Sequence, residues 1–264
     1  MHKKLFLIAL FSFILNGCLT GGSYIKDGSV EYYKKSAENG DAEAQYELGV
    51  IYDQGMLVTQ DYNEAIKWYR KSAEQGNKNA QYNLGSMYEY GKDYPEAVKW
   101  YLKAAEQGMS DAQFNLAVLY SYGKGVKQNH TEAVKWLHKS AEQGNMEAQF
   151  NLGQAYYFAK GVEKDYSKAF TWFEKSAAQG HSNAQQMMGL MLVSGKGVEI
   201  DYSNAMKWFI KSAEQGNTDA QLSIGAMYEL GFGVDESIDI AKKWYKKAAE
   251  KGNLKAKENL ARFQ

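Results

Sequence analysis

The side chains that could perform catalysis or hold a metal are few in this sequence, and they do not converge. The four histidines are His2, His130, His138 and His181, and no two of them have the spacing of a metal-ligand pair. Neither a His-Glu-x-x-His motif nor a phosphate-binding loop occurs. A single cysteine, Cys18, excludes an internal disulfide framework and a zinc site built from several cysteines. We therefore expect no metal and no cofactor.

Two Ser-x-x-Lys motifs, Ser23–Lys26 and Ser121–Lys124, are the remaining candidates for chemistry. Serine β-lactamases carry their nucleophile in such a motif, together with Ser-Asp-Asn and Lys-Thr-Gly motifs that are missing from this chain. The serine and lysine content makes this number of matches expected by chance. The sequence therefore predicts no catalytic residues.

Composition indicates a folded and mostly helical chain. The 264 residues are 45% hydrophobic and include one proline, whereas a loop-rich β protein uses proline often in its turns. Basic and acidic side chains number 31 each, so the charge balance offers no concentrated basic surface for nucleic acid. We expect no nucleic-acid partner.

The first residues have the character of an export signal. A basic head containing Lys3 and Lys4 precedes an apolar run from Leu5 to Leu15, which is too short to span a bilayer as a stable helix. Leu15-Asn16-Gly17-Cys18 resembles the lipobox of bacterial lipoproteins. That resemblance implies a signal peptide over residues 1–17, with the chain cut before Cys18.

Cys18 would then carry lipid and hold the protein on a membrane without a spanning helix. An ordinary signal peptide cut nearby, with Cys18 incidental, is the alternative, and both interpretations mean export. By resemblance, Leu19 after the cysteine favours the outer membrane, on its periplasmic face or at the cell surface. Residues 18–27 are expected to form a flexible tether.

The rest of the chain is one unit repeated. An Ala-Gln pair and a tryptophan each recur every 36 residues, and both series contain the same single shorter step of 32. That step falls in the loop before Pro95, which is four residues shorter than its equivalents. The alanines are Ala44, Ala80, Ala112, Ala148, Ala184, Ala220 and Ala256, of which the last precedes Lys257 in place of a glutamine, and the tryptophans are Trp68, Trp100, Trp136, Trp172, Trp208 and Trp244. A fixed period of this length predicts a solenoid.

Each unit is expected to contain two helices. In residues 145–180 the apolar side chains follow helical spacing twice, with a Gly-containing loop between the helices and a closing glycine, Gly180. A second small residue recurs inside the first helix, as at Gly153, where glycine costs about 1 kcal/mol relative to alanine. This recurrence suggests that another helix backbone approaches there, with the Trp and Tyr rings filling the gaps between units.

These patterns resemble the Sel1-like repeats (SLR), relatives of the tetratricopeptide repeats. Ala112–Tyr120 with Gly123-Lys124-Gly125-Val126 and Ala184–Leu192 with Gly195-Lys196-Gly197-Val198 show the resemblance well. It covers residues 28–264 and implies an all-α fold, a right-handed superhelical solenoid of antiparallel helix pairs. Six repeats are expected to begin near residues 40, 76, 108, 144, 180 and 216, with cap helices at 29–39 and 253–263.

The resemblance also raises an enzymatic alternative. Cysteine-rich members of the family are linked to penicillin binding and β-lactamase activity, but they carry a disulfide pair in each repeat, and this chain has none. A cell-wall-related hydrolase of that type is therefore the alternative to a binding scaffold.

The candidate partner-binding surface is the concave face, which the first helix of each repeat lines in the family. On a helical wheel, the positions three and ten residues after the marker alanine point away from the core. In repeats two to four they are occupied by Asn83, Asn115 and Asn151, and by Tyr90, Tyr122 and Phe158. Asparagine can bond an extended peptide backbone as donor and acceptor, and aromatic rings supply contact area. The alternative is that these rings pack between repeats.

We therefore expect a repeat scaffold that binds a protein or peptide in an adaptor, effector-immunity or host-interaction role.

Overall fold

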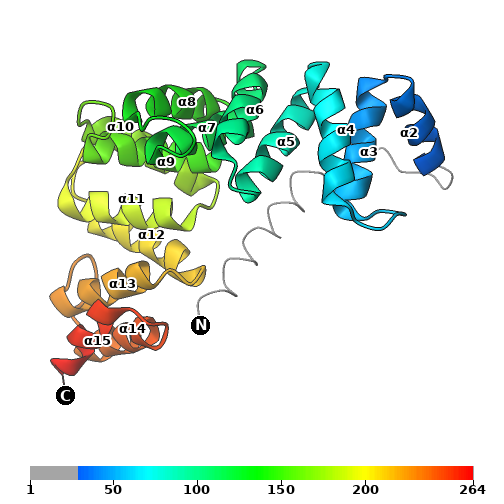
Figure 1. Ribbon diagram of the computed structural model, residues 1–264. Coiled ribbons are helices and arrows are strands. Elements are labelled where there is room, and N and C mark those ends of the chain that lie inside the picture. The colour runs from blue at the N-terminus through cyan, green and yellow to red at the C-terminus, as the bar shows by residue number, and fades with distance from the viewer. Residues whose placement is uncertain (1–28, 264) are drawn as a thin grey trace. The chain divides into compact units, whose positions relative to one another are not determined.

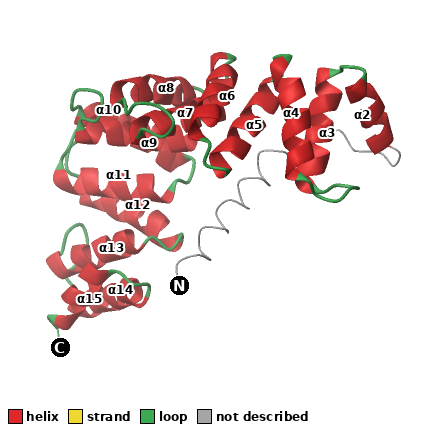
Figure 2. Ribbon diagram, viewed as in Figure 1, coloured by secondary structure: helices red, strands yellow, loops and turns green. Residues whose placement is uncertain are grey.

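The computed structural model describes residues 29–263, which are helical apart from short connections (Figures 1 and 2). Fourteen helices and no strand occur in these residues, which confirms the all-α prediction. The expected signal peptide at 1–17, the Cys18 anchor and the tether at 18–27 lie outside the described residues.

The chain divides into two compact units, Met1–Asn77 and Lys78–Gln264. The described part of the first unit contains α2 (Ser29–Glu38), α3 (Ala42–Gln54) and α4 (Tyr62–Glu74). The second contains α5 (Lys78–Tyr90), α6 (Tyr94–Glu106), α7 (Ser110–Tyr122), α8 (His130–Glu142), α9 (Met146–Phe158), α10 (Tyr166–Ala178), α11 (Ser182–Ser194), α12 (Tyr202–Glu214), α13 (Thr218–Leu230), α14 (Ile238–Glu250) and α15 (Leu254–Ala261).

The helices from α3 to α14 form six antiparallel hairpins, which we number as repeats one to six. The first helix of a repeat (α3, α5, α7, α9, α11 or α13) is its A helix, and the second is its B helix. Within each unit every helix packs against the next one along the chain. The prediction of a solenoid of antiparallel helix pairs is thereby confirmed.

Local sequence sets the helix ends. The A helix of repeat four is capped by Asn145, whose side chain accepts a hydrogen bond from the backbone N–H of Ala148 at 2.9 Å. Its B helix is capped by Asp165, which accepts from the N–H of Lys168 at 2.9 Å. Gly180 closes this B helix at φ 100°, as its position in the repeat predicted.

The recurring glycine inside the A helix has a different cause from the one the sequence suggested. The atoms nearest to it belong not to a second backbone but to an aromatic ring of the B helix in the same repeat. A Cβ added at Gly153 would lie 2.6 Å from Cδ1 of Phe173, and one at Gly85 would lie 2.8 Å from Cδ1 of Tyr101. The expectation of a backbone contact is therefore wrong, and the glycine serves as a seat for a ring.

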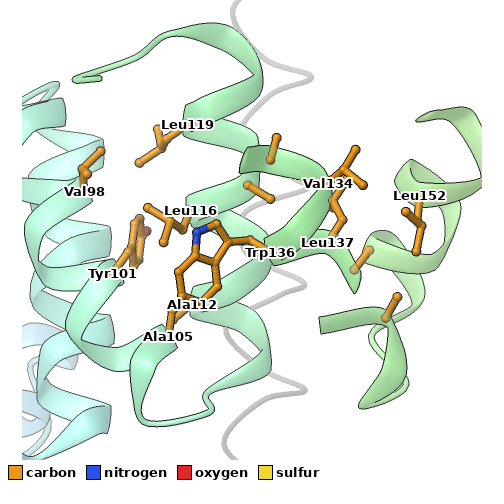
Figure 3. Close-up of a cluster of buried hydrophobic side chains, with 14 of the residues drawn as sticks. Val98, Tyr101, Ala105, Ala112, Leu116, Leu119, Val134, Trp136, Leu137 and Leu152 are labelled. Carbon is orange, nitrogen blue, oxygen red and sulfur yellow. The ribbon is translucent and has the colours of Figure 1, made fainter. Parts of the chain in front are cut away.

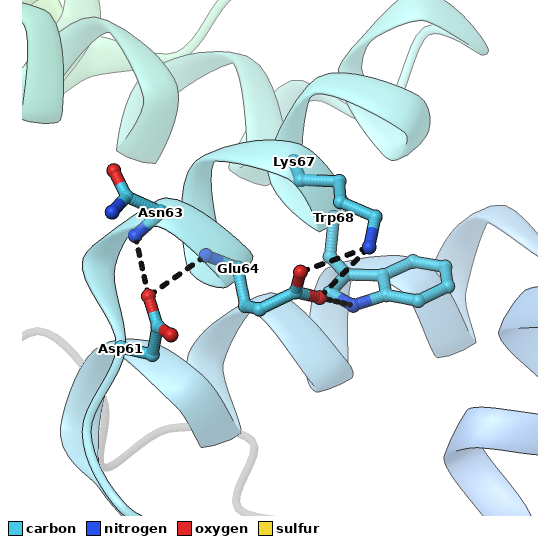
Figure 4. A network of polar contacts seen from close by, with 5 residues as sticks. All are labelled: Asp61, Asn63, Glu64, Lys67 and Trp68. Atoms are coloured by element: carbon cyan, nitrogen blue, oxygen red, sulfur yellow. Dashed lines mark hydrogen bonds and ion pairs between the residues drawn. The ribbon is translucent and has the colours of Figure 1, made fainter.

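The tryptophans lie on the B helices and interact with charged neighbours. Figure 4 shows Trp68 donating from its indole N–H to Glu64 at 3.1 Å, while Lys67 forms an ion pair with the same carboxylate at 2.9 Å. Lys71, one turn later, places its ammonium 4.2 Å from the centre of the Trp68 ring. The same lysine–tryptophan pairing recurs in all six repeats.

The hydrophobic core runs along the middle of the hairpins. In repeats two to four it includes Tyr101, Leu116, Trp136, Leu137 and Leu152, which come from the four consecutive helices α6 to α9 (Figure 3). Within each helix the buried side chains recur at helical spacing, so one face of the helix is buried.

A pair of glutamines, one buried and one exposed, joins successive helices where a B helix ends. Gln149 donates to the carbonyl of Ala141 at 3.1 Å and accepts from Gln179 at 2.8 Å. Gln113 makes the equivalent bonds with Ala105 and Gln143, at 3.0 and 2.7 Å. These bonds satisfy polar groups that would otherwise be buried without partners.

Candidate functional site

The three rings predicted for partner binding all lie at the last residue of their A helices and are largely exposed. Tyr90 is 82% exposed, Tyr122 71% and Phe158 53%. We call Tyr90, Tyr122 and Phe158 the ring row. The sequence left open the alternative that these rings are buried between repeats. Side chains exposed to this extent are not buried in that way.

The three asparagines predicted with the rings are half-buried, and they differ in what surrounds them. Asn115 lies close to the phenol of Tyr82, whose pKa burial raises to about 12. Asn151 lines a cleft together with Tyr122. The structure therefore brings one predicted asparagine and one predicted ring to the same place.

This cleft lies between repeats three and four and has a volume of about 130 Å³; because most of its lining residues belong to repeat three, we call it the cleft of repeat three. Its apolar part is lined by Ala117, Val118, Ala133, Val134, Leu137 and Ala155. Its polar part is lined by Ser121, Tyr122, His130, Asn151, Gln154 and Lys160. None of the lining residues carries a carboxylate, so the charge that faces a ligand in the cleft is positive.

A row of lysines beside the rings was not predicted. The residue twelve positions after the marker alanine is Lys92, Lys124, Lys160 and Lys196 in repeats two to five. The ammonium groups of Lys124 and Lys160 each lie 6.0 Å from the centre of the adjacent ring, Tyr122 or Phe158. Applying the repeat period at this position would have found the row.

The histidines in the described residues lie in separate environments. His130 lines the cleft. His138 contacts the Tyr156 hydroxyl at 3.0 Å, and burial lowers its pKa. His181 caps α11, accepting from the N–H of Ala184 at 3.0 Å. Such a cap requires a neutral ring whose proton sits on Nε2.

The two residues of the described Ser-x-x-Lys motif, Ser121 and Lys124, lie in different surroundings. Ser121 lines the cleft, whereas Lys124 does not, and its ammonium lies 5.1 Å from the centre of the Tyr94 ring. A serine nucleophile requires a base within hydrogen-bond reach of its hydroxyl.

No three His, Cys, Asp or Glu side chains in residues 29–263 are grouped so that they could hold a metal ion. No helix in the same range has both the length and the apolar character needed to cross a bilayer.

The fold and the exposed A-helix face define an all-α repeat scaffold. The model of the Sel1 repeat family matches nearly all of the described chain, in segments 26–41, 42–77, 78–109, 110–145, 147–181, 182–217 and 218–253. The chain therefore belongs to the Sel1 repeat family, as its motifs indicated.

Two solved structures are similar over most of this chain. One is a protective antigen present in uropathogenic Escherichia coli strains that displays an SLR fold, with 40% identity and a TM-score of 0.81 over 88% of this chain. This chain covers only 50% of that protein's length. The other is a Sel1 repeat protein from Oxalobacter formigenes, with 32% identity and a TM-score of 0.68 over 83% of this chain and 92% of that one. The comparison with functionally curated proteins gives no match.

Proposed function

We propose that this chain is an exported, lipid-anchored, non-catalytic scaffold that holds a protein or peptide partner on the A-helix face of repeats two to four. The observation that carries the proposal is the ring row, three exposed aromatic side chains that recur at the repeat period beside a cleft. Exposed aromatic side chains are the residues that most often dominate binding energy at protein interfaces.

The polar groups near the rings suit an extended chain. Asn151 and Gln154 both line the cleft, and a carboxamide can donate to a peptide carbonyl and accept from a peptide N–H. The lysine beside each of the last two rings adds positive charge along the same face. This combination favours a peptide segment with aromatic and acidic residues.

The expected signal peptide at residues 1–17 supports a location outside the cytoplasm. The apolar run ending at Leu15 and the lipobox-like residues before Cys18 support export and lipid attachment to the outer membrane. The 40% identical relative is a protective antigen, and an antigen must be met by the immune system. Among adaptor, effector-immunity and host-interaction roles, this relationship favours the host-facing one.

Replacing the ring row tests the binding face. We expect Tyr90→Ala, Tyr122→Ala and Phe158→Ala together to reduce capture of partner proteins at least tenfold. The thermal midpoint should be nearly unchanged, because exposed side chains contribute little to folding. The measurement is quantitative mass spectrometry of proteins retained from envelope extracts and from host-cell surface proteins.

A matched control replaces three similarly exposed side chains outside the row, Tyr62, Leu230 and Leu254, with alanine. Leu230 holds the same position in its repeat as the rings do in theirs. Equal loss of capture in both variants would show that the row has no special role, and a large drop in the midpoint of the row variant would show that the rings are structural.

Cys18→Ser tests the anchor. Without the thiol no lipid can be attached, so we expect the protein to move from the membrane fraction to the soluble fraction and to lose incorporation of labelled palmitate. Unchanged fractionation would refute the anchor while leaving the binding face intact.

Nitrocefin turnover tests the hydrolase alternative, for which the position of Ser121 in the cleft is the one favourable observation. We expect no turnover by the purified mature protein. Clear turnover that disappears in Ser121→Ala would overturn the scaffold proposal.

A further inference from the structure

The cleft of repeat three lies where other repeats hold a ring of their own. In repeat two, Tyr101 lies against Gly85 and its hydroxyl donates to Glu89 at 2.9 Å. In repeat six, Tyr245 lies against Gly225 in the same way, with its hydroxyl on Glu229. A ring, a glycine and a carboxylate thus form one ring seat within the hairpin.

Repeat three differs at all three positions of this seat. The ring is replaced by Leu137, the glycine by Ala117 and the carboxylate by Ser121. All three replacements line the cleft. The cleft therefore lies where repeat three lacks the ring and the carboxylate. A tyrosine fills the corresponding space in repeats two and six, and repeat three leaves it open to solvent.

The size and lining of the cleft suit an aromatic ring. Its volume of about 130 Å³ is close to the ~150 Å³ of a protein cavity that accepts benzene. Alanine, valine and leucine side chains form its apolar part, while Ser121 and Gln154 offer hydrogen bonds to a phenol. Ser121 occupies the repeat position at which a carboxylate accepts from the phenol in repeats two and six.

The charge around the cleft determines which charged groups of a partner can lie beside the ring. Lys160 and His130 line it, and no lining residue is acidic. Lys124, next to Tyr122, adds a further positive charge. A negative group beside the ring would therefore be attracted, and a positive one repelled.

We propose that the cleft of repeat three is a specificity pocket for a phenylalanine or tyrosine side chain in an acidic segment of the partner protein. The proposal rests on the proposed function, because it names the partner chemistry of the same face. The partner's ring completes the seat that repeat three lacks.

Small aromatic probes test the pocket directly. The mature protein, labelled with ¹⁵N, is titrated with 4-hydroxyphenylacetate, with p-cresol and with cyclohexylacetate. We expect saturable amide shifts centred on Ala117, Ser121 and Ala155, and at least threefold tighter binding of 4-hydroxyphenylacetate than of either other probe. Equal binding of cyclohexylacetate, or shifts scattered away from these residues, would overturn the proposal.

The decisive variant fills the pocket with the side chains that repeat two carries at the same positions. Ala117→Gly, Ser121→Glu and Leu137→Tyr together recreate the ring seat of repeat two, and should remove probe binding while keeping the fold. Ser121→Tyr alone is a second variant that covers the cleft from its rim, and it has a precedent in Tyr157 at the same position of repeat four. Undiminished binding in a folded form of either variant would overturn the proposal.

Lys160→Gln separates the charge from the ring. It should weaken binding of 4-hydroxyphenylacetate severalfold and leave p-cresol unchanged, and an equal effect on both probes would refute the role of charge. Failure of the pocket is distinguishable from failure of the proposed function. If probes do not bind while the ring-row variant still loses its partner, the pocket is wrong and the binding face stands.

Discussion

The two edges of each hairpin follow different rules. At one edge a B helix ends and the next A helix begins, and the same hydrogen bonds recur there. A buried glutamine such as Gln149 donates to a carbonyl of the preceding B helix and accepts from a second glutamine. At the edge where an A helix ends, Tyr90, Tyr122 and Phe158 give way to Ser194 and Leu230 in repeats five and six. We call these the constant edge and the variable edge.

This contrast separates stacking from recognition. The constant edge buries polar groups that must all be satisfied, so few changes are tolerated there. Side chains at the variable edge are exposed, and their replacement costs little stability. A repeat protein can therefore change its partner at one edge without altering how its hairpins stack at the other.

The largest expected effect comes from breaking the constant edge. Gln149→Ala removes the bond to the Ala141 carbonyl and the acceptor for Gln179, and we expect the free energy of unfolding to fall by about 3 kcal/mol because buried polar groups lose partners. Denaturant unfolding measures this loss. The control is Gln154→Ala on the same helix, which should change stability little but reduce partner capture. Equal stability losses in the two variants would erase the distinction between the edges.

A smaller effect is expected inside the hairpin. Gly153→Ala places a methyl against the Phe173 ring, and we expect a loss of about 2 kcal/mol from the forced shift of that ring. Adding Phe173→Leu recreates the Ala117 and Leu137 combination of repeat three and should recover part of the loss. A double-mutant cycle by denaturant unfolding measures the coupling, and strictly additive effects would contradict the ring seat.

The smallest expected effect concerns repeat six, where the hydrogen bonds of the constant edge are incomplete. In repeat six, Lys251 replaces the second glutamine, and the Oε1 of Gln221 has no hydrogen-bond partner. Lys251→Gln should supply the missing donor and raise the free energy of unfolding by about 1 kcal/mol. A result at or below zero in equilibrium unfolding would show that this oxygen is satisfied in another way, for example by water.

The fold was predictable because its determinants are local and periodic. The Ala-Gln and tryptophan periods located every hairpin, and glycines such as Gly180 marked helix ends. The same reasoning misjudged Gly153, because a recurring small residue reports a close approach but not which atoms approach. It also used Gln149 as a marker without recognising its role, since the two partners of this glutamine lie on other helices.

The candidate site was predictable only in part. The exposure of Tyr90, Tyr122 and Phe158 followed from a helical wheel, which needs one helix alone. The cleft depends on three helices, α7, α8 and α9, and on the combined absence of a ring at Leu137 and an acid at Ser121. The sequence displays both replacements, but their meaning appears only when the other repeats show what those positions normally hold.

The glutamine bonds between hairpins have a consequence for how such a chain can change its length. Because the junctions from repeat two to repeat five use the same residue types and the same hydrogen bonds, these hairpins can follow one another without a new interface. Gene duplication or loss of one 36-residue unit would then preserve every remaining junction. Such a chain can grow or shrink in whole units while it keeps any recognition residues already placed along it.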